Sequence, residues 1–378
     1  MKLTVSRVAS LEALRPEWEQ LDRTTFPRLP FSSARWTSLW LRHFAEDRAL
    51  IKDELMLLAL RDETGVLRGL APMVLSQRPS IGPVRTRMLR MIGADPNITE
   101  LSSPICAPEH APVVLEALLK YLDANDGMWD LVFFNGIRES AANVLEARGN
   151  VHWGSEQPCF VLKLPPTWDA LRAQLGRNLK ESLRKCYNSL KRDNHHFELR
   201  VRSRPDEMVE ALDHFFRLHN ARSTLTGTTD HKDVFALERS RLFLRDCMAA
   251  AAGAGEARVF QLEIGGQVVA TRLAFALDDQ LYLYFSGFDP AWKQYSVMTT
   301  TVAEAIRWAI EQRFAVVNLS PGRDVSKTRW DPVEIPFREV YLPSQSLRGG
   351  LVHRAYLELG DRSSRLGQLI SFARRHAE

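Results

Sequence analysis

One arrangement of segments occurs twice along this chain of 378 residues, and it restricts the fold more than any other feature. Residues 54–75 and 257–287 each hold an apolar run, a glycine turn and a second apolar run, which is the pattern of a β-hairpin. Each hairpin is followed further on by a helical pattern and one short apolar strand, within residues 110–136 and 301–322. We therefore predict an internal duplication of an α+β unit of about 150 residues.

The composition is that of an ordinary soluble globular chain, with 45% hydrophobic and 25% charged residues. No apolar run approaches the roughly 20 residues of a membrane-spanning helix, and the N-terminus lacks the apolar segment of a secretory signal. The four cysteines are far apart and form no CxxC pair, so we expect neither a disulfide framework nor a bound metal. These features favour a cytoplasmic protein that is not transmembrane.

The duplication divides the chain into two halves and a tail. We expect an N-terminal half over residues 1–165, a C-terminal half over residues 166–345 and a basic helical tail over residues 346–378. The tail reads as two short amphipathic helices that pack against the second half, and binding to a membrane surface is the alternative.

A basic helix is predicted to open the second half, over residues 168–193. Its apolar positions recur every four residues, as in a helix. Seven Lys or Arg residues lie between Arg172 and Arg192 against one acid, Glu181, although the whole chain carries a net charge of only +4. This basic helix face either binds an anion or is simply exposed to solvent. No helix-turn-helix or zinc-finger pattern is present, so DNA is not an expected partner.

The stretch GFDPAWKQYS, from Gly287 to Ser296, joins a strand pattern to the start of a long helical pattern. A helix N-terminus offers unpaired N–H groups and the positive end of a dipole, which suit phosphate. Ser296 is placed as the N-cap of this helix, Lys293 adds a cation, and Trp292 and Tyr295 add flat surfaces. The stretch therefore suits the pyrophosphate of a CoA-like molecule, unless it is merely a turn that caps the helix.

The sequence from Tyr284 to Trp330 resembles the cellulose-biosynthesis-type (CelD/BcsL-like) acetyltransferase family. That family is a branch of the GNAT N-acyltransferase superfamily and is related to the Fem-type peptidyltransferases. The resemblance covers residues 165 to 345 well and the first half loosely. The residues that match the family's motif are Gly287, Phe288, Asp289, Pro290, Trp292, Tyr295, Ser296, the run Glu304 to Ala309, Gly322, Asp324, Lys327 and Trp330.

The resemblance implies two tandem GNAT-like halves, each a mostly antiparallel mixed sheet flanked by helices, with the first half degenerate. It implies transfer of an acyl group, with acetyl as the expected one, from acyl-CoA to an amine or hydroxyl of a small-molecule or glycan-linked acceptor in polysaccharide biosynthesis. Charged tRNA, as in the Fem-type enzymes, is the second choice of donor, and a scaffold without activity is the third interpretation. The chain departs from the family at Val297 and Met298, where Pro-Gly is usual.

The candidate site residues follow from the motif and from chemistry. We predict that the donor contacts the loop and the helix start, at Asp289, Trp292, Lys293, Gln294, Ser296, Val297 and Met298. His219 is the candidate base, with a pKa suited to neutral pH, and Tyr284 and Tyr295 are candidates for protonating the leaving thiolate. The acceptor is expected at Arg222, Asp324, Lys327 and Trp330. The alternatives are a structural histidine, a core role for Tyr284 and an ion pair between Asp324 and Lys327.

Overall fold

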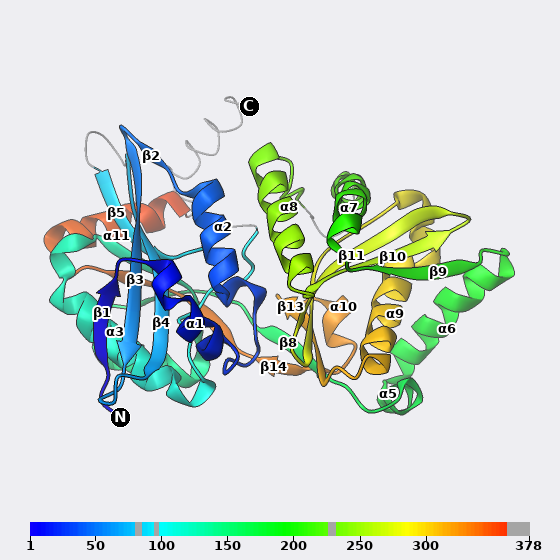
Figure 1. Ribbon diagram of the computed structural model, residues 1–378, viewed down its shortest axis with the longest axis horizontal. Coiled ribbons are helices and arrows are strands. Elements are labelled where there is room, and N and C mark those ends of the chain that lie inside the picture. The colour runs from blue at the N-terminus through cyan, green and yellow to red at the C-terminus, as the bar shows by residue number, and fades with distance from the viewer. Residues whose placement is uncertain (80–84, 94–97, 226–231, 361–378) are drawn as a thin grey trace.

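Two twisted sheets, each flanked by helices, lie side by side in the computed structural model of the chain (Figure 1). The structure describes residues 1–79, 85–93, 98–225 and 232–360. Among these residues, no helix combines the length and the apolar character that crossing a bilayer requires.

The first sheet has the strand order β1-β3-β4-β5-β6-β15-β7, with the short β2 paired to β3. The hairpin predicted at residues 54–75 is confirmed as β3 and β4, and it turns through Gly65 at a positive φ of 84°. The strands are β1 (Thr4–Val8), β2 (Asp47–Arg48), β3 (Ile51–Arg61), β4 (Leu67–Pro79), β5 (Arg85–Met91), β6 (Leu131–Arg138), β7 (His152–Glu156) and β15 (Phe337–Pro343). The helices of this half are α1 (Leu11–Asp22), α2 (Ala34–Phe44), α3 (Ala111–Ala124), α4 (Ala142–Arg148) and α11 (Leu347–Gly360).

The second sheet has the strand order β14-β8-β13-β12-β11-β10-β9. Its strands are β8 (Cys159–Lys163), β9 (Phe197–Arg202), β10 (Ala257–Ile264), β11 (Gln267–Leu277), β12 (Gln280–Phe288), β13 (Val316–Pro321) and β14 (Val333–Ile335). Its helices are α5 (Trp168–Gln174), α6 (Arg177–Arg192), α7 (Met208–Ser223), α8 (Glu238–Gly253), α9 (Val297–Glu311) and α10 (Val325–Thr328). The second predicted hairpin is therefore confirmed as β10 and β11, with β12 as the next antiparallel strand.

The two sheets repeat one topology. Every described strand pair is antiparallel except β5 with β6 in the first sheet and β12 with β13 in the second. In each case a helix, α3 or α9, connects the parallel strands, as a crossover requires. The predicted fold class, α+β with mostly antiparallel sheets, is confirmed.

The halves exchange strands across the boundary expected at residue 165. Strand β8 lies between β13 and β14 in the second sheet, and β15 returns to lie between β6 and β7 in the first sheet. The chain therefore crosses twice between the sheets, and neither sheet is complete without a strand from beyond that boundary.

Two sequence expectations about helices need correction. The single helix predicted over residues 168–193 is two helices, α5 and α6, because Leu175 takes an extended conformation with ψ of 143°. Gly176 then serves as the N-cap of α6, and glycine is among the poorest residues for continuing a helix. In the tail, α11 (residues 347–360) packs on β15 and β6 of the first sheet rather than on the second half, and the second predicted helix falls within residues 361–378, which lie outside the described part of the chain.

A shared core joins the halves. The ring of Phe31 contacts Tyr282 at a centroid distance of 5.5 Å, and Trp36 meets Phe243 edge-on at 5.0 Å. Helices α2 and α8 face each other at this junction (Figure 1). The aromatic rings that link the sheets bury large apolar areas, so the halves are expected to unfold together.

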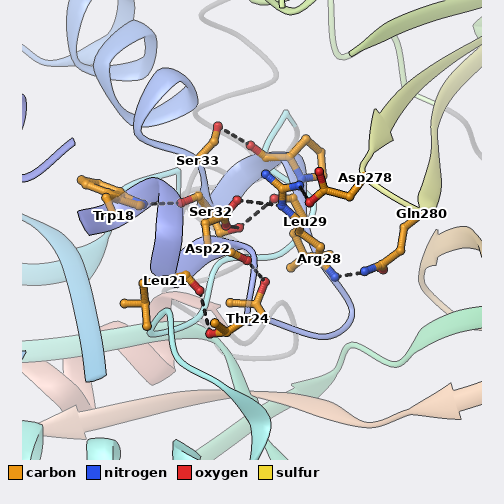
Figure 2. A network of polar contacts seen from close by, with 12 residues as sticks. Trp18, Leu21, Asp22, Thr24, Arg28, Leu29, Ser32, Ser33, Asp278 and Gln280 are labelled. Carbon is orange, nitrogen blue, oxygen red and sulfur yellow. Dashed lines mark hydrogen bonds and ion pairs between the residues drawn. The ribbon is translucent and has the colours of Figure 1, made fainter. Parts of the chain in front are cut away.

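A buried polar network adds to the junction. Figure 2 shows Arg28 between Asp22 of α1 and Asp278 of the β11–β12 turn, with ion-pair distances of 2.9 and 2.6 Å. The backbone N–H of Arg28 donates to the Gln280 side chain at 3.1 Å, and Ser32 donates to Asp22. Burial raises the pKa of the Asp22 carboxyl, which its hydrogen-bond partners counteract. The network thus ties the first half to the start of β12.

Candidate active site

Strands β12 and β13 separate soon after they meet. They pair in parallel over only three positions, from Gln280–Val316 to Tyr282–Asn318, although β12 continues to Phe288 and β13 to Pro321. A bulge between Arg272 and Ala274 also shifts the register of β11 against β12 at this level. We call the opening between the ends of β12 and β13 the wedge. Where two strands no longer pair, their backbone and side-chain groups can face a ligand.

Helix α7 lies unusually close to β12, and this contact places two candidate residues. A Cβ atom on Gly287 would lie 2.4 Å from the backbone nitrogen of His219, so only glycine fits there. The close approach brings His219 Nδ1 within 2.9 Å of the Ser286 carbonyl oxygen. It also lets Arg222 Nη1 donate a 2.6 Å hydrogen bond to Ser286 Oγ.

His219 is enclosed by aromatic rings. It is 6% exposed, stacks on Phe215 at 5.2 Å and meets the edges of Phe235 and Phe285. Burial lowers the pKa of the imidazole. Among the described residues Nε2 has no hydrogen-bond partner, and its nearest carboxylate oxygen is Asp233 Oδ1 at 3.7 Å. A neutral ring that donates Nδ1–H to the carbonyl keeps the lone pair of Nε2, which can accept a proton.

The segment after β13 carries the predicted acceptor residues. Asp324 accepts a 2.6 Å hydrogen bond from the backbone N–H of Ser326 and so caps the short helix α10. Lys327 Nζ donates to the carbonyl oxygens of Pro321 and Gly322 at the end of β13. Burial lowers the pKa of Lys327. The Asp324 charge acts on both Arg222 and Lys327, so the structure gathers these residues at the wedge.

The first half contributes a carboxylate to the same place, which the sequence reasoning missed. Glu100 Oε2 accepts a 2.6 Å hydrogen bond from the Tyr282 hydroxyl, and burial raises the pKa of Glu100. Arg272 of β11 lies within electrostatic range of Glu100, and burial lowers the pKa of its guanidinium to about 10. Glu100 is far from these residues in sequence, so no local pattern could have indicated the contact.

The N-terminus of α9 differs from the prediction in one respect. Ser296 occupies the N-cap position, but its backbone is left-handed, with φ of 53°, and its side chain makes no capping hydrogen bond. The backbone N–H groups of Val297 and Met298 have no hydrogen-bond partner among the described residues. Arg329, also missed, donates a 3.0 Å hydrogen bond to Thr299 Oγ1 in the first turn of the helix. This end of α9 therefore combines backbone N–H donors that are unpaired among the described residues with a guanidinium.

The loop before α9 forms a 3₁₀ turn, Pro290–Tyr295, which Asp289 caps through the N–H of Ala291. The Tyr295 hydroxyl donates to Asp193 Oδ2 at 3.0 Å and lies 3.2 Å from His195 Nε2, and Trp292 packs edge-on against the His195 ring. The end of α6 thus holds this loop in place. Two other predicted loop residues, Lys293 and Gln294, are exposed.

Two predicted site residues lie in packed surroundings. Tyr284 is 1% exposed within the aromatic core between the halves, and its hydroxyl donates to the carbonyl of Ile98. Trp330 is equally buried in the apolar core of the second half. The structure therefore brings His219, Arg222, Asp324 and Lys327 toward one another, whereas Tyr284, Tyr295 and Trp330 lie in three separate apolar clusters. In the described part of the chain, no group of three His, Cys, Asp or Glu side chains is arranged to hold a metal.

Part of the chain that holds this site matches a known domain family. The family model described as "Acetyltransferase (GNAT) domain" matches residues 177–328. No curated protein matches the sequence. The C-terminal domain of a putative lysylphosphatidylglycerol synthetase from Agrobacterium fabrum is similar in structure, with a TM-score of 0.53, 11% identity and 93% of this chain and 97% of that chain covered.

Two other solved structures share the whole architecture. FemX superposes with a TM-score of 0.58 at 10% identity, over 89% of this chain and 97% of that chain. A tandem GNAT protein from the clavulanic acid biosynthesis pathway superposes with a TM-score of 0.50 at 11% identity, over 91% of this chain and 99% of that chain. Residues 177–328 thus form a GNAT-type acetyltransferase domain, within a chain that has the fold of tandem GNAT proteins.

Proposed function

We propose that the second half transfers an acetyl or other acyl group from acyl-CoA to an amine or hydroxyl of a small-molecule or glycan-linked acceptor. The observation that carries this proposal is the open N-terminus of α9, with Arg329 at its first turn, beside the wedge between β12 and β13. A cytoplasmic location and a role in polysaccharide biosynthesis, as in the cellulose-biosynthesis-type family, belong to the same proposal.

The donor fits the start of α9. The N–H group of Met298 would donate to a pyrophosphate oxygen, and the helix dipole and Arg329 favour the negative charge. At the departure from Pro-Gly, Val297 is 1% exposed as a whole residue, and Met298, which is partly exposed, packs against the same apolar cluster. Direct contact with the pyrophosphate is therefore proposed for Met298 and Arg329, since Val297 is too enclosed to take part.

The acceptor reacts at the level of His219 in this proposal. As the acceptor nitrogen bonds to the thioester carbonyl carbon, His219 Nε2 accepts the proton that the nitrogen loses, and the carbon–sulfur bond breaks. The thiolate then takes a proton from solvent, since the hydroxyls of Tyr284 and Tyr295 already donate to Ile98 and Asp193. Arg222 and Ser286 hold the strand and helix that position His219.

Charged tRNA is the second candidate donor, and α6 is the observation that favours it. A groove of 820 Å³ lies between α5, α6 and α9, with Arg172, Lys180 and Arg184 on its walls. Lys185 and Lys191 of α6 are also exposed. Asp169, Glu181 and Glu304 also line or border this groove, so its charge is mixed. Binding to tRNA phosphates through this surface would weaken steeply as salt is added.

Thermal unfolding of the full chain with acetyl-CoA, longer acyl-CoAs, free CoA and aminoacyl-tRNA separates these functions. A ligand at about 100 times its Kd adds about 2.7 kcal/mol to the free energy of unfolding. The acyl-CoA proposal predicts a higher Tm with acyl-CoA that varies with acyl length. A rise with aminoacyl-tRNA alone, lost at high salt, would establish the second candidate, and no rise with any donor would leave the scaffold interpretation.

A further inference from the structure

Three cationic side chains and the carboxylates of Glu100 and Asp324 form one charged cluster. Arg222 comes from α7, Arg272 from β11 and Lys327 from α10, and burial lowers the pKa of each. The charge of Glu100 acts on Arg272 and Lys327, and the charge of Asp324 acts on all three cations. All five side chains keep part of their surface accessible. This partly exposed cluster carries three positive charges against two negative ones.

Arg272 is a cation of this cluster with an unused hydrogen-bond donor. Its Nε is buried and has no partner among the described residues, and Nη2 makes only a 3.5 Å contact with the Leu283 carbonyl. Among the described residues, no carboxylate lies within ion-pair distance of the Arg272 guanidinium. Lys327, in contrast, already donates to two backbone carbonyls. Leaving a buried guanidinium donor unpaired costs free energy of folding, so we expect a fold that keeps this donor to use it.

The backbone is irregular next to Arg272. The pairing of β11 with β12 passes from Arg272–Ser286 to Ala274–Leu283, so one extra residue is accommodated on β12 between Leu283 and Ser286. Bulges of this kind redirect side chains and concentrate next to active sites. Arg272 therefore stands at the level of Ser286, which also receives the hydrogen bonds from α7.

We propose that Arg272 binds a carboxylate of the acceptor, so that the acceptor of the transferase is a carboxylate-bearing amine such as a free amino acid. The Nε and Nη2 donors of one guanidinium form a fork that matches the two oxygens of a carboxylate, whereas Lys presents a single point charge. Glu100 then faces the amine of the same acceptor. This inference rests on the proposed function for the direction of transfer, but binding of the carboxylate is independent of the donor.

The test measures binding of acceptors without any donor. The probes are L-alanine, β-alanine and L-glutamate, each against its carboxamide at matched ionic strength, with inorganic phosphate as the other anion. The proteins are the full wild-type chain, Arg272→Lys, Arg272→Met and Arg7→Gln, the last removing a surface partner of Glu54 in the first half. Thermal unfolding with each probe gives the apparent affinity.

At least one amino acid should bind the wild type and Arg7→Gln, and its amide should bind about tenfold more weakly or not at all. Arg272→Met should lose this preference, Arg272→Lys should keep only part of it, and Arg272→Met without ligand should be as stable as the wild type or more stable. Equal binding of acids and amides, preference for phosphate, no binding by the wild type, or a large loss of stability in Arg272→Met would each overturn the proposal. Acetyl-CoA is measured on the same proteins: if it fails to stabilise them while the carboxylate binds, the proposed function fails and this site stands.

Discussion

The hydroxyl of Tyr282, in the second half, donates a 2.6 Å hydrogen bond to Oε2 of Glu100, in the first half. Tyr282 is also the last residue of β12 that pairs with β13, so this contact lies where the wedge begins. The first half, which lies outside the GNAT domain match, therefore contributes a carboxylate to the polar cluster of the second half. The two halves are expected to act as one functional unit.

The Tyr282–Glu100 hydrogen bond should be measurable as a coupling energy. Tyr282→Phe leaves the Glu100 carboxyl without this donor and should cost about 1–2 kcal/mol of the free energy of unfolding. In a Glu100→Gln background the same substitution should cost less, with a coupling of at least about 0.5 kcal/mol in a double-mutant cycle by urea unfolding. Strictly additive costs would show that the contact does not join the halves.

Gly287 should not tolerate a methyl group. In Gly287→Ala the new Cβ would lie 2.4 Å from the His219 nitrogen and 2.5 Å from the Leu218 carbonyl carbon, so backbone must move. The free energy of unfolding should fall by about 1–3 kcal/mol or more. Gly253→Ala is the matched control, since its Cβ meets nothing within 4 Å and its φ is not positive, and it should be neutral or slightly stabilising. Equal stability of the two variants would contradict the close packing of α7 on β12.

The buried His219 should make the protein less stable in mild acid. Its pKa is lowered in the folded state, so on acidification the unfolded chain, with a histidine pKa of about 6.5, takes up the proton first. The stability that the neutral ring contributes is complete above that unfolded value and is lost as the pH falls through the lower folded pKa.

Urea unfolding at about pH 7.5 and about pH 5.5 checks this. The wild type should lose more stability between these two pH values than His219→Gln does. Burial also lowers the pKa of His353, but that contribution is present in both proteins and cancels in the comparison. An identical loss in the wild type and His219→Gln would mean that His219 is not held neutral by burial.

The Arg28 network should contribute strongly to the free energy of unfolding at the junction between the halves. Arg28→Ala leaves the carboxylate of Asp22, which is 3% exposed, without its ionic partner, and breaking a buried pair from one side costs about 3–5 kcal/mol. Lys120→Ala breaks the exposed pair with Glu116 and should cost less than about 1 kcal/mol. Chemical denaturation of both variants measures the two losses in the free energy of unfolding. Losses of similar size would contradict a stabilising role for the buried Arg28 network.

The fold was predictable because its signals are local. Alternating apolar runs around Gly65 and Gly265 specify hairpins whatever the rest of the chain does, and both hairpins formed as predicted. The exchange of β8 and β15 was not predictable, because a short apolar strand carries no information about which sheet it joins. Ser296 was predicted to cap α9 from its residue type, but its left-handed backbone depends on how the preceding turn packs against α6.

The candidate site was predictable only where it follows a motif. His219, Arg222, Asp324 and Lys327 lie in segments with a recognisable pattern, and these residues meet at the wedge. Glu100, Arg272 and Tyr282 are brought together by sheet pairing between distant segments, and the alternating run around Tyr282 reads simply as core. Arg329 lies next to Trp330 in the motif segment, so a search for cations beside the predicted phosphate site could have found it.

Calorimetric titration of acetyl-CoA into the full chain tests the central claim most directly. The wild type should bind acetyl-CoA, and Arg329→Gln should bind it at least about tenfold more weakly, because the guanidinium at the first turn of α9 is removed. Arg307→Gln, on the exposed side of the same helix in a surface pair with Glu311, should bind like the wild type. Absence of acetyl-CoA binding in the wild type, or equal affinity in all three proteins, would contradict a donor site at the N-terminus of α9.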